Sequence, residues 1–464
     1  MLLPHEFTLG DFISSLTIEN RPFKIGRDGK FQDEGQSVLH HAMYSQNPVI
    51  YALMSFTENI REGNQVWMLF QILNRVRANR FSEEEQHLFK RVISILLVVL
   101  PFEKVLAVFI ALRRSRANRK RVRKTVLSYI FNHPEIRFLA LQQRKTIVDC
   151  IEHAAGKNVA RACAKYVKEL DSGSNDKTKS NYLNRHLLCF AENHEQAKRV
   201  LGFLYQKETR PAVMPEREIS SRPDYRHLFE PKIETPKTVT ATNRGDIAAT
   251  LVHIYRGGAT STLMEALADF VADEASTTLP FEGKLAVILD ASTSTQGYGE
   301  REFCIISQSV ALLQVLEVCC QNLQVYIAGG DGTPPRPMGP SDLATPLLEA
   351  LESKPDLVVI ISDGYENSFA GDLKDVVAYL PQADIRIPVV FCHSKFTGKD
   401  DLSLRNPLPQ KLQIEFWHQN DFNSILFQLF AMAGGWYRTD WLQSVLTDRL
   451  NNIEKEIPTW MSLT

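Results

Sequence analysis

The sequence predicts an α-helical first half followed by an α/β second half with a mostly parallel, doubly wound sheet. Two patterns predict this division. Apolar residues recur every three or four positions over most of residues 1–210, which is helical periodicity. Over residues 283–433, short runs rich in Val, Ile and aromatic residues alternate with helical stretches. Such alternation is typical of a sheet that is covered by helices.

The predicted helices of the first half follow one another with short polar breaks. Ser82 precedes one apolar run as a candidate N-cap, and Glu85 completes a capping box. Further helices are expected over residues 134–170 and 180–206. Short helix pairs in succession are typical of solenoids, so we expect a superhelix or ring of HEAT-like repeats, although no sequence repeat is evident.

The chain between the two halves is rich in proline and lacks periodicity, as expected of a linker. A short helical section follows it and leads into the first strand. The expected organisation is a helical HEAT-like domain over residues 1–210, a linker over 211–244, a helical connector over 245–282, an α/β domain over 283–433 and a C-terminal helical tail over 434–464.

Five strands and four helices are expected in the α/β domain. The strands are predicted at residues 285–290, 323–330, 357–364, 387–393 and 412–418, and the helices at residues 301–321, 345–353, 370–380 and 421–433. In open α/β sheets, ligands bind beyond the carboxyl ends of the strands. Asp290 and Asp363 come at the ends of two predicted strands, so both are expected at that edge of the sheet.

Charge is distributed unevenly along the 464 residues. The whole chain carries 53 Lys and Arg against 54 Asp and Glu, a net charge of −1. Residues 1–244 carry 39 Lys and Arg against 26 Asp and Glu, a net charge of +13, whereas residues 245–464 carry 14 against 28, a net charge of −14. This asymmetry predicts an anionic partner for the first half.

Positive charge is densest in the stretch "RRSRANRKRVRKT" at residues 113–125. Arginine binds phosphate through paired hydrogen bonds, and aromatic residues between the cations could stack on RNA bases. The alternatives are that these aromatic residues belong to the core and that the run is a solvated face or contacts the acidic half. The candidate RNA-binding residues are Arg113, Arg114, Arg116, Arg119, Lys120, Arg121, Arg123 and Lys124.

A second candidate site begins in "LAVILDASTST", where an apolar strand ends on Asp290. A buried carboxylate costs free energy unless a partner compensates its charge. Two carboxylates and three hydroxyls form an all-oxygen set, which suits Mg²⁺ or Mn²⁺. The alternative is that the acids lie in turns and that the hydroxyl residues cap helices. The predicted metal ligands are Asp290, Ser292, Ser294, Thr345 and Asp363.

The motif Asp-x-Ser-x-Ser after a first strand, followed by Thr near a helix start and Asp-Gly after a later strand, resembles the metal-ion-dependent adhesion site (MIDAS) of von Willebrand factor A domains. The resemblance covers residues 283–433. It implies that the α/β domain is a Rossmann-like von Willebrand A domain and that its metal ion binds a protein partner.

The order of the two halves resembles that of Ro RNA-binding proteins, in which a helical TROVE domain precedes a von Willebrand A domain. "LMEALADFVADEASTTLPFEGKLAVILDAS" and "SDGYENSFAG" carry this resemblance. It implies a ribonucleoprotein whose helical domain binds small non-coding or misfolded RNA. The alternative is an interaction scaffold without RNA, because "ATPLLEAL" is similar to bacterial A-domain proteins that are partners of MoxR-type AAA+ ATPases.

The remaining features narrow the class of protein. The seven cysteines include no CxxC pair, which favours reduced thiols in a cytoplasmic protein over a disulfide framework. Polar residues interrupt the first twelve positions, and the longest apolar run, residues 92–102, is too short to span a bilayer. We therefore expect no membrane contact and no extracellular adhesin. No catalytic motif is evident, so we expect no enzyme.

Overall fold

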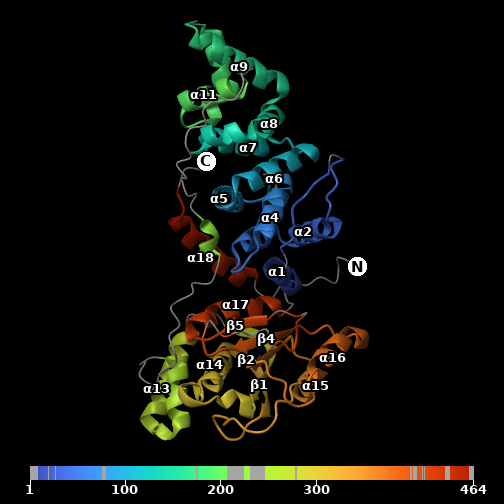
Figure 1. Ribbon diagram of the computed structural model, residues 1–464, viewed down its shortest axis with the longest axis vertical. Coiled ribbons are helices and arrows are strands. Elements are labelled where there is room, and N and C mark those ends of the chain that lie inside the picture. Colours follow the sequence, from blue (N-terminus) through green and yellow to red (C-terminus); the bar gives the residue numbers. More distant parts are fainter. Residues whose placement is uncertain are drawn as a thin grey trace. The chain divides into compact units, whose positions relative to one another are not determined.

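The computed structural model separates the chain into two compact units, a helical unit and an α/β unit (Figure 1). The helical unit contains Leu16–Pro231 and the chain from Gln443 onward. The α/β unit contains Glu6–Ser15 and Lys232–Leu442. The described residues are 9–18, 20–26, 28–75, 80–173, 176–205, 224–229, 246–276, 280–397, 400, 405–409, 411, 413–433 and 439–458.

The helical unit is built from successive helices that pack on their neighbours. α4 packs on α2, α5 and α6, α7 packs on α8, and α9 packs on both α8 and α10. The bounds are α2 Glu34–Gln46, α3 Pro48–Leu53, α4 Glu62–Arg75, α5 Glu83–Val99, α6 Phe102–Arg114, α7 Lys120–Asn132, α8 Ile136–Ala155, α9 Lys157–Asp171, α10 Lys177–His186 and α11 His194–Leu204. The helix α1 (Leu9–Ile18) precedes them in the chain, and its residues up to Ser15 belong to the α/β unit.

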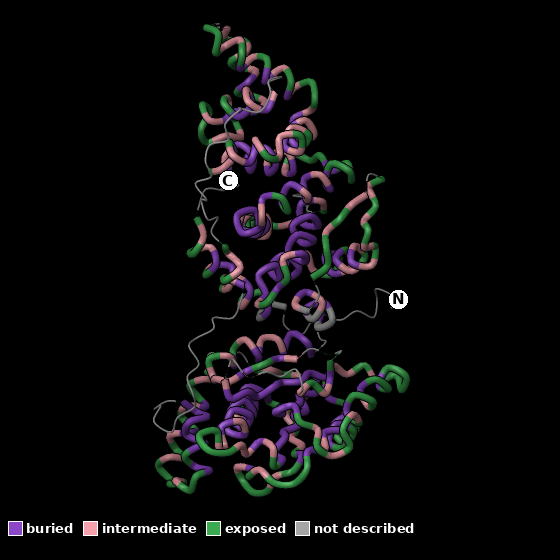
Figure 2. Tube along the Cα trace, in the orientation of Figure 1, coloured by how far each residue is buried: buried purple, intermediate pink, exposed green. Residues whose placement is uncertain are grey.

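The predicted capping box at the start of α5 is confirmed. The backbone N–H of Glu85 donates to Ser82 Oγ at 3.1 Å, and the backbone N–H of Ser82 donates to Glu85 Oε2 at 2.7 Å. Buried residues concentrate where the helices of this unit lie against one another, as Figure 2 shows. Tyr129 and Phe131, two of the aromatic residues interleaved with the basic run, are fully buried, so they belong to the core and are not exposed for base stacking.

The α/β unit has a five-stranded sheet in the order β2-β1-β3-β4-β5, with every pair of neighbours parallel. The expected alternation of strands and helices is confirmed. The bounds are α12 Ile247–His253, α13 Ser261–Ser276, β1 Phe281–Ala291, α14 Cys304–Cys319, β2 Cys320–Gly329, α15 Ala344–Glu352, β3 Leu357–Ser362, α16 Asp372–Tyr379, β4 Val389–Ser394, β5 Gln413–Phe416 and α17 Phe422–Met432.

Helices cover both faces of this sheet, which explains the near-continuous apolar strands. On β1, Leu285 and Val287 belong to one buried cluster together with residues of α12, α14 and α17. Ala286 and Ile288 point the other way, into a second buried cluster with residues of α15 and α16. Successive side chains of a strand face opposite sides of the sheet, so a strand that is buried on both sides has no polar face.

The segment 245–282 differs from its expected role as a separate connector. Ile247 and Leu251 of α12 and Val271 of α13 lie in the same buried cluster as Leu285 of β1. These helices are therefore part of the α/β unit, because they cover apolar surface of its sheet.

The C-terminal segment also differs from the expected separate tail. Leu446 and Leu450 of α18 (Thr439–Glu456) are buried, and the chain from Gln443 onward belongs to the helical unit. Arg91 of α5 donates from Nη2 to Glu454 Oε2 at 2.5 Å and to Asn451 Oδ1 at 2.6 Å. Apolar burial and these hydrogen bonds return the end of the chain to the helical unit.

Part of the expected linker, residues 224–229, also packs on the helical unit. The backbone N–H of Asn59 donates to the carbonyl of Phe229 at 2.7 Å, and Arg226 Nη1 donates to Gln65 Oε1 at 3.0 Å. The rest of the expected linker lies outside the described residues.

One described segment, Gly299–Cys319, is long and apolar enough to cross a membrane by length and composition, but most of it is buried as the core helix of the α/β unit.

Candidate metal centre

The sheet places the two predicted acids at adjoining strand ends. Leu289 of β1 pairs with Ile361 of β3, so the next residues, Asp290 and Ser362, lie side by side, and Asp363 follows directly. The strand order reverses between β1 and β3, because β2 lies on one side of β1 and the later strands on the other. This is the topological switch point, where α/β sheets bind ligands.

Asp290 is buried, and both of its carboxylate oxygens accept hydrogen bonds. The backbone N–H of Ser292 donates to Oδ1 at 3.0 Å, while the hydroxyls of Ser341 and Ser362 donate to Oδ2 at 3.1 and 2.6 Å. Burial raises the pKa of Asp290, and these hydrogen bonds oppose that shift. The carboxylate is thus held in one orientation by three donors.

Asp363 is equally buried but is less well satisfied. Oδ1 accepts from the backbone N–H of Tyr365 at 3.1 Å, whereas no described residue donates a hydrogen bond to Oδ2. Burial, and after it the charge of Asp290, raises the pKa of Asp363 to about 6. Gly364 has φ +85°, and a Cβ there would lie 2.6 Å from the carbonyl oxygen of Arg405, so only glycine fits the turn after the strand.

The hydroxyls of Ser292 and Ser294 lie 3.0 Å apart in the turn after β1. The Ser294 hydroxyl acts to lower the pKa of Asp363, although burial and Asp290 outweigh it. Gly329 at the end of β2 has φ +71°, and a Cβ there would lie 3.0 Å from Ser292 Cα. The close approach of these backbones holds the serine turn against the sheet. Asp290, Ser292, Ser294 and Asp363 are therefore brought together.

Thr345, the fifth predicted ligand, makes no described hydrogen bond to this group. It is exposed in the first turn of α15, and its Oγ1 donates to Asp342 Oδ2 at 2.7 Å. The hydroxyl that contacts Asp290 from this loop is that of Ser341, which the sequence analysis missed, as it did Ser362. The signal for Ser341 was the tripeptide "PSD" ahead of the helix, and the signal for Ser362 was its position directly before Asp363.

The donor set fits a hard divalent cation. Asp363 Oδ2 is a buried acceptor without a described donor, beside a second buried carboxylate, and such a pair of charges requires a cation or a proton. In the described part of the chain, no three His, Cys, Asp or Glu side chains lie close enough together to hold a metal ion. The oxygen atoms that could bind a cation together with Asp290 and Asp363 are therefore those of hydroxyl groups. Carboxylate and hydroxyl oxygens suit Mg²⁺ or Mn²⁺ better than Zn²⁺.

The basic run lies in the helical unit, where most of its arginines bond to the protein itself. Arg119 Nη1 donates to the carbonyl of Asn74 at 3.0 Å, Arg121 Nη2 to Gln86 at 3.3 Å and Arg123 Nε to Ala154 at 2.7 Å. Arg113 pairs with Asp149. Arg116 and Lys120 are exposed, and Lys124 is half-buried. At least five of the eight predicted RNA-binding residues, Arg114 among them, therefore make contacts within the fold.

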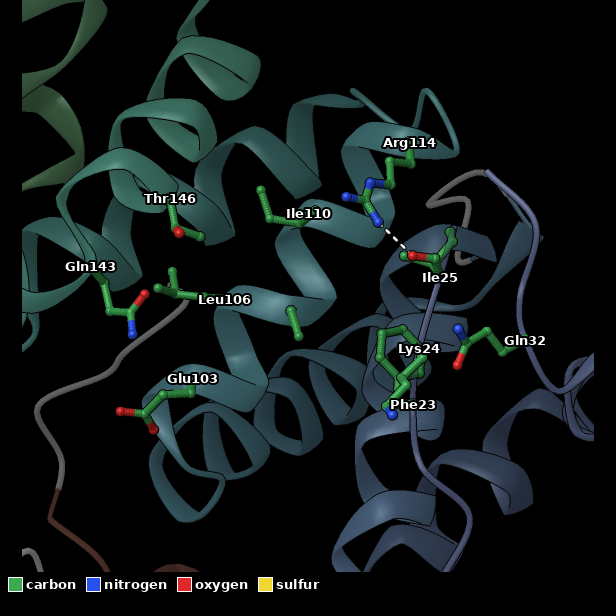
Figure 3. Close-up of a pocket in the computed structure, with 11 residues that line it drawn as sticks. Phe23, Lys24, Ile25, Gln32, Glu103, Leu106, Ile110, Arg114, Gln143 and Thr146 are labelled. Atoms are coloured by element: carbon green, nitrogen blue, oxygen red, sulfur yellow. Dashed lines mark hydrogen bonds between the residues drawn. The ribbon is translucent and has the colours of Figure 1, made fainter. Parts of the chain in front are cut away.

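Arg114, the fifth of these, lies at one end of a cavity of about 400 Å³ (Figure 3). It donates a hydrogen bond to the carbonyl of Ile25, and Leu106 and Ile110 of α6 form an apolar wall. Gln143, on the wall that α8 forms, has non-helical φ and ψ of −115° and 24°. The lining is mixed in polarity and contains no group of acids or hydroxyls like that beside β1.

No family model matches the chain, and no curated protein sequence matches it.

Proposed function

We propose that the α/β unit is a metal-dependent binding module, similar to a von Willebrand A domain, in which Mg²⁺ or Mn²⁺ mediates contact with a protein partner. The observation that carries the proposal is the buried pair Asp290 and Asp363, with the Oδ2 atom of Asp363 lacking a described donor. The cation, when bound, supplies positive charge and a coordination position for an oxygen atom of the partner. This is a binding role and not an enzymatic one.

The proposed ligands are the carboxylates of Asp290 and Asp363 and the hydroxyls around them. Ser292 and Ser294 remain proposed metal ligands, as the motif indicates. Ser341 replaces Thr345 as a proposed ligand because its hydroxyl contacts Asp290. Ser362 orients Asp290 through its own hydrogen bond at 2.6 Å. Residues that orient a metal ligand contribute strongly to metal affinity.

Calorimetric titration of the whole chain with Mg²⁺ and with Mn²⁺ tests this assignment. We expect Asp290→Ala to abolish binding and Ser341→Ala to weaken it by about tenfold, as losses around metal ligands typically do. Thr345→Ala is the matched control, because it removes a hydroxyl from the same loop, and it should bind like the wild type. An equal loss in Ser341→Ala and Thr345→Ala would contradict the ligand assignment, and no binding by the wild type would contradict the function.

For the helical unit we propose a solenoid of HEAT-like repeats that binds small or misfolded RNA, in the manner that the resemblance to Ro proteins implies. Two observations favour RNA. Residues 1–244 carry a net charge of +13, and Arg116 and Lys120 of the basic run extend into solvent. Lysine and arginine at such positions bind phosphates and release counterions.

Electrophoretic mobility of small RNAs with the whole chain tests this second proposal. We expect binding that weakens steeply as the salt concentration rises, and that weakens further in the double variant Arg116→Gln, Lys120→Gln. The competing function is a scaffold for an AAA+ ATPase. If the chain co-purifies with such an ATPase and carries no RNA, and if Asp290→Ala abolishes this co-purification, the result would favour the scaffold and contradict RNA binding.

A further inference from the structure

The cavity of the helical unit is a groove that runs along one face of α6, here called the α6 groove. Its floor is formed by Glu103, Leu106, Ala107, Ile110 and Arg114, which lie on one side of the helix because three or four residues separate them along the chain. The stripe from Glu103 to Arg114 covers about 16 Å along the helix axis. A volume of about 400 Å³ lies within the range of roughly 300–1,000 Å³ that is usual for small-molecule sites. The groove is therefore large enough for a small organic ligand.

One wall of the α6 groove comes from the chain before α2 and is anchored to the core. Ile25 and Phe31 form an antiparallel bridge, and the ring centroids of Phe23 and Phe31 lie 4.8 and 4.6 Å from that of Trp67 on α4. This aromatic packing holds the wall against the helices. The residues of this wall that line the groove are Phe23, Lys24, Ile25 and Gln32.

The other wall is α8, whose helical backbone is broken at Gln143 (Figure 3). The residues around the break, "ALQQRKT", include no proline or glycine, which are common causes of a kink. A tertiary contact accompanies the break instead, because Arg144 Nε donates to the carbonyl of Leu204 at 3.0 Å. Gln143 and Thr146 line the groove, so this wall supplies an amide and a hydroxyl beside the apolar floor.

Opposite charges lie on the two sides of the apolar floor, as Figure 3 shows. Arg114 donates a hydrogen bond to the carbonyl of Ile25, the residue after Lys24, so both cations lie beside the first wall. Glu103 lies at the other end of the stripe, in the first turn of α6. Among the described residues, no side chain pairs with those of Lys24, Glu103 or Gln143. These three polar groups are therefore available to a ligand.

We propose that the α6 groove binds one unpaired nucleotide of an RNA, and that the base of this nucleotide carries an exocyclic amino group. The base lies on the apolar floor of Leu106, Ala107 and Ile110, and its phosphate binds the cations of the first wall. Glu103 accepts a hydrogen bond from the amino group, as carboxylates do from cytosine, while the Gln143 amide can both donate and accept. Uracil has no amino group, so the groove discriminates against it.

The arrangement of charge favours a nucleotide over simpler ligands. A purely anionic ligand would place negative charge beside Glu103, and a purely cationic ligand would place positive charge beside Arg114 and Lys24. A nucleotide instead carries its negative charge on the phosphate and its hydrogen-bond donors on the distant edge of the base. The RNA part of this inference rests on the proposed RNA-binding function, whereas the nucleotide site rests on the groove itself.

Fluorescence anisotropy with the whole chain tests the site, using a short uridine RNA whose central base is uracil, cytosine, adenine or guanine. We expect the uracil form to bind about tenfold more weakly than the best amino-bearing form, as loss of a base contact predicts. Glu103→Ala should abolish this preference. Its matched control is Glu84→Ala, which removes an exposed acid from the first turn of α5 and should retain the preference.

Lys24→Gln separates the phosphate contact from the base contact. It should weaken the binding of all four RNAs alike, because a phosphate contact carries no information about the base. A change in base preference in Lys24→Gln, with none in Glu103→Ala, would contradict the assigned orientation of the nucleotide.

The outcomes separate the nucleotide site from RNA binding. Equal affinity for all four RNAs would overturn the site and leave RNA binding in place, and so would an equal effect of Glu84→Ala. If no RNA binds, the RNA-binding function fails, and calorimetric titration with the 5′-monophosphates of cytidine, adenosine and guanosine then decides the site. Binding of one of them that is lost in Glu103→Ala would support a site for a free nucleotide, and no binding by the wild type would overturn the site.

Discussion

Asp363 is buried beside Asp290, and its Oδ2 atom accepts no hydrogen bond from a described residue. In the metal-free protein this charge is therefore a cost to folding. We expect Asp363→Asn to raise the free energy of unfolding of the metal-free protein by about 3 kcal/mol, the order that a pKa shift of this size implies. Thermal unfolding in the presence of a chelator measures the change.

Added Mg²⁺ should reverse that ranking, because the wild type gains stability from the bound cation and the variant does not. Glu349→Gln on α15 is the control, since it neutralises an exposed acid of the same unit and should alter neither measurement. A metal-free Asp363→Asn protein less stable than the wild type would show that the carboxylate stabilises the fold by itself.

His40 is a second buried titratable group with a strongly shifted pKa. Its Nδ1 lies 2.7 Å from Tyr51 Oη, and its Nε2 lies 2.9 Å from Gln36 Nε2. Burial lowers the pKa of His40 to about 3, against the opposing hydrogen bond with Asn64. Since the unfolded chain binds this proton near pH 6.5 and the folded chain does not, stability is complete above pH 6.5 and falls as the pH drops toward 3.

Urea unfolding at pH 7.5 and pH 5.5 measures this dependence. We expect the wild type to lose about 1 kcal/mol more than His40→Gln between these pH values. His194→Gln, which changes an exposed histidine, should retain the wild-type dependence. Parallel losses in the wild type and in His40→Gln would show that the His40 ring takes up its proton without unfolding.

At the scale of helices and strands, the basic run contributes to the fold as well as to charge. Arg123 Nε donates to the carbonyl of Ala154 at 2.7 Å, in the last turn of α8, where carbonyls lack helical partners. We expect Arg123→Gln to lower the free energy of unfolding by about 1 kcal/mol, since a cation at a helix C-terminus also favours the helix dipole. Chemical denaturation measures the loss.

Lys120→Gln is the control for that change, because Lys120 is exposed in the first turn of α7, where a cation opposes the dipole. It should not destabilise the protein. Equal stability of Arg123→Gln and the wild type would show that the hydrogen bond to Ala154 contributes nothing. The comparison matters for RNA measurements, since weaker RNA binding by Arg123→Gln would reflect both the lost positive charge and the lower stability of the variant.

At the scale of the whole molecule, the end of the chain completes the helical unit. Leu446 and Leu450 are buried, and Arg91 contacts Asn451 and Glu454. We expect truncation after Leu442 to lower the melting temperature of the helical unit by several degrees, because it removes both leucines, exposes the apolar surface that they cover and leaves Arg91 without these partners. The Mg²⁺-dependent stabilisation of the α/β unit should persist.

Glu454→Gln is the control for the truncation, since the ion pair is partly exposed and such pairs contribute about 1 kcal/mol or less. It should shift the melting temperature far less than the truncation does. A truncated chain that melts like the wild type would contradict the role of α18 as a structural part of the helical unit.

The sequence alone predicts the two classes of structure, the strand and helix ranges around the candidate site, and four of the five ligands proposed there. These are local properties: periodicity follows from which faces are buried, and Asp290 and Asp363 directly follow apolar strands whose ends must meet in a parallel sheet. Tertiary contacts were needed to show that Ser341 and not Thr345 contacts Asp290, and that residues 246–276 and α18 pack within the units. These facts depend on contacts between residues distant in sequence, and no local pattern records which of several hydroxyls will meet a given carboxylate.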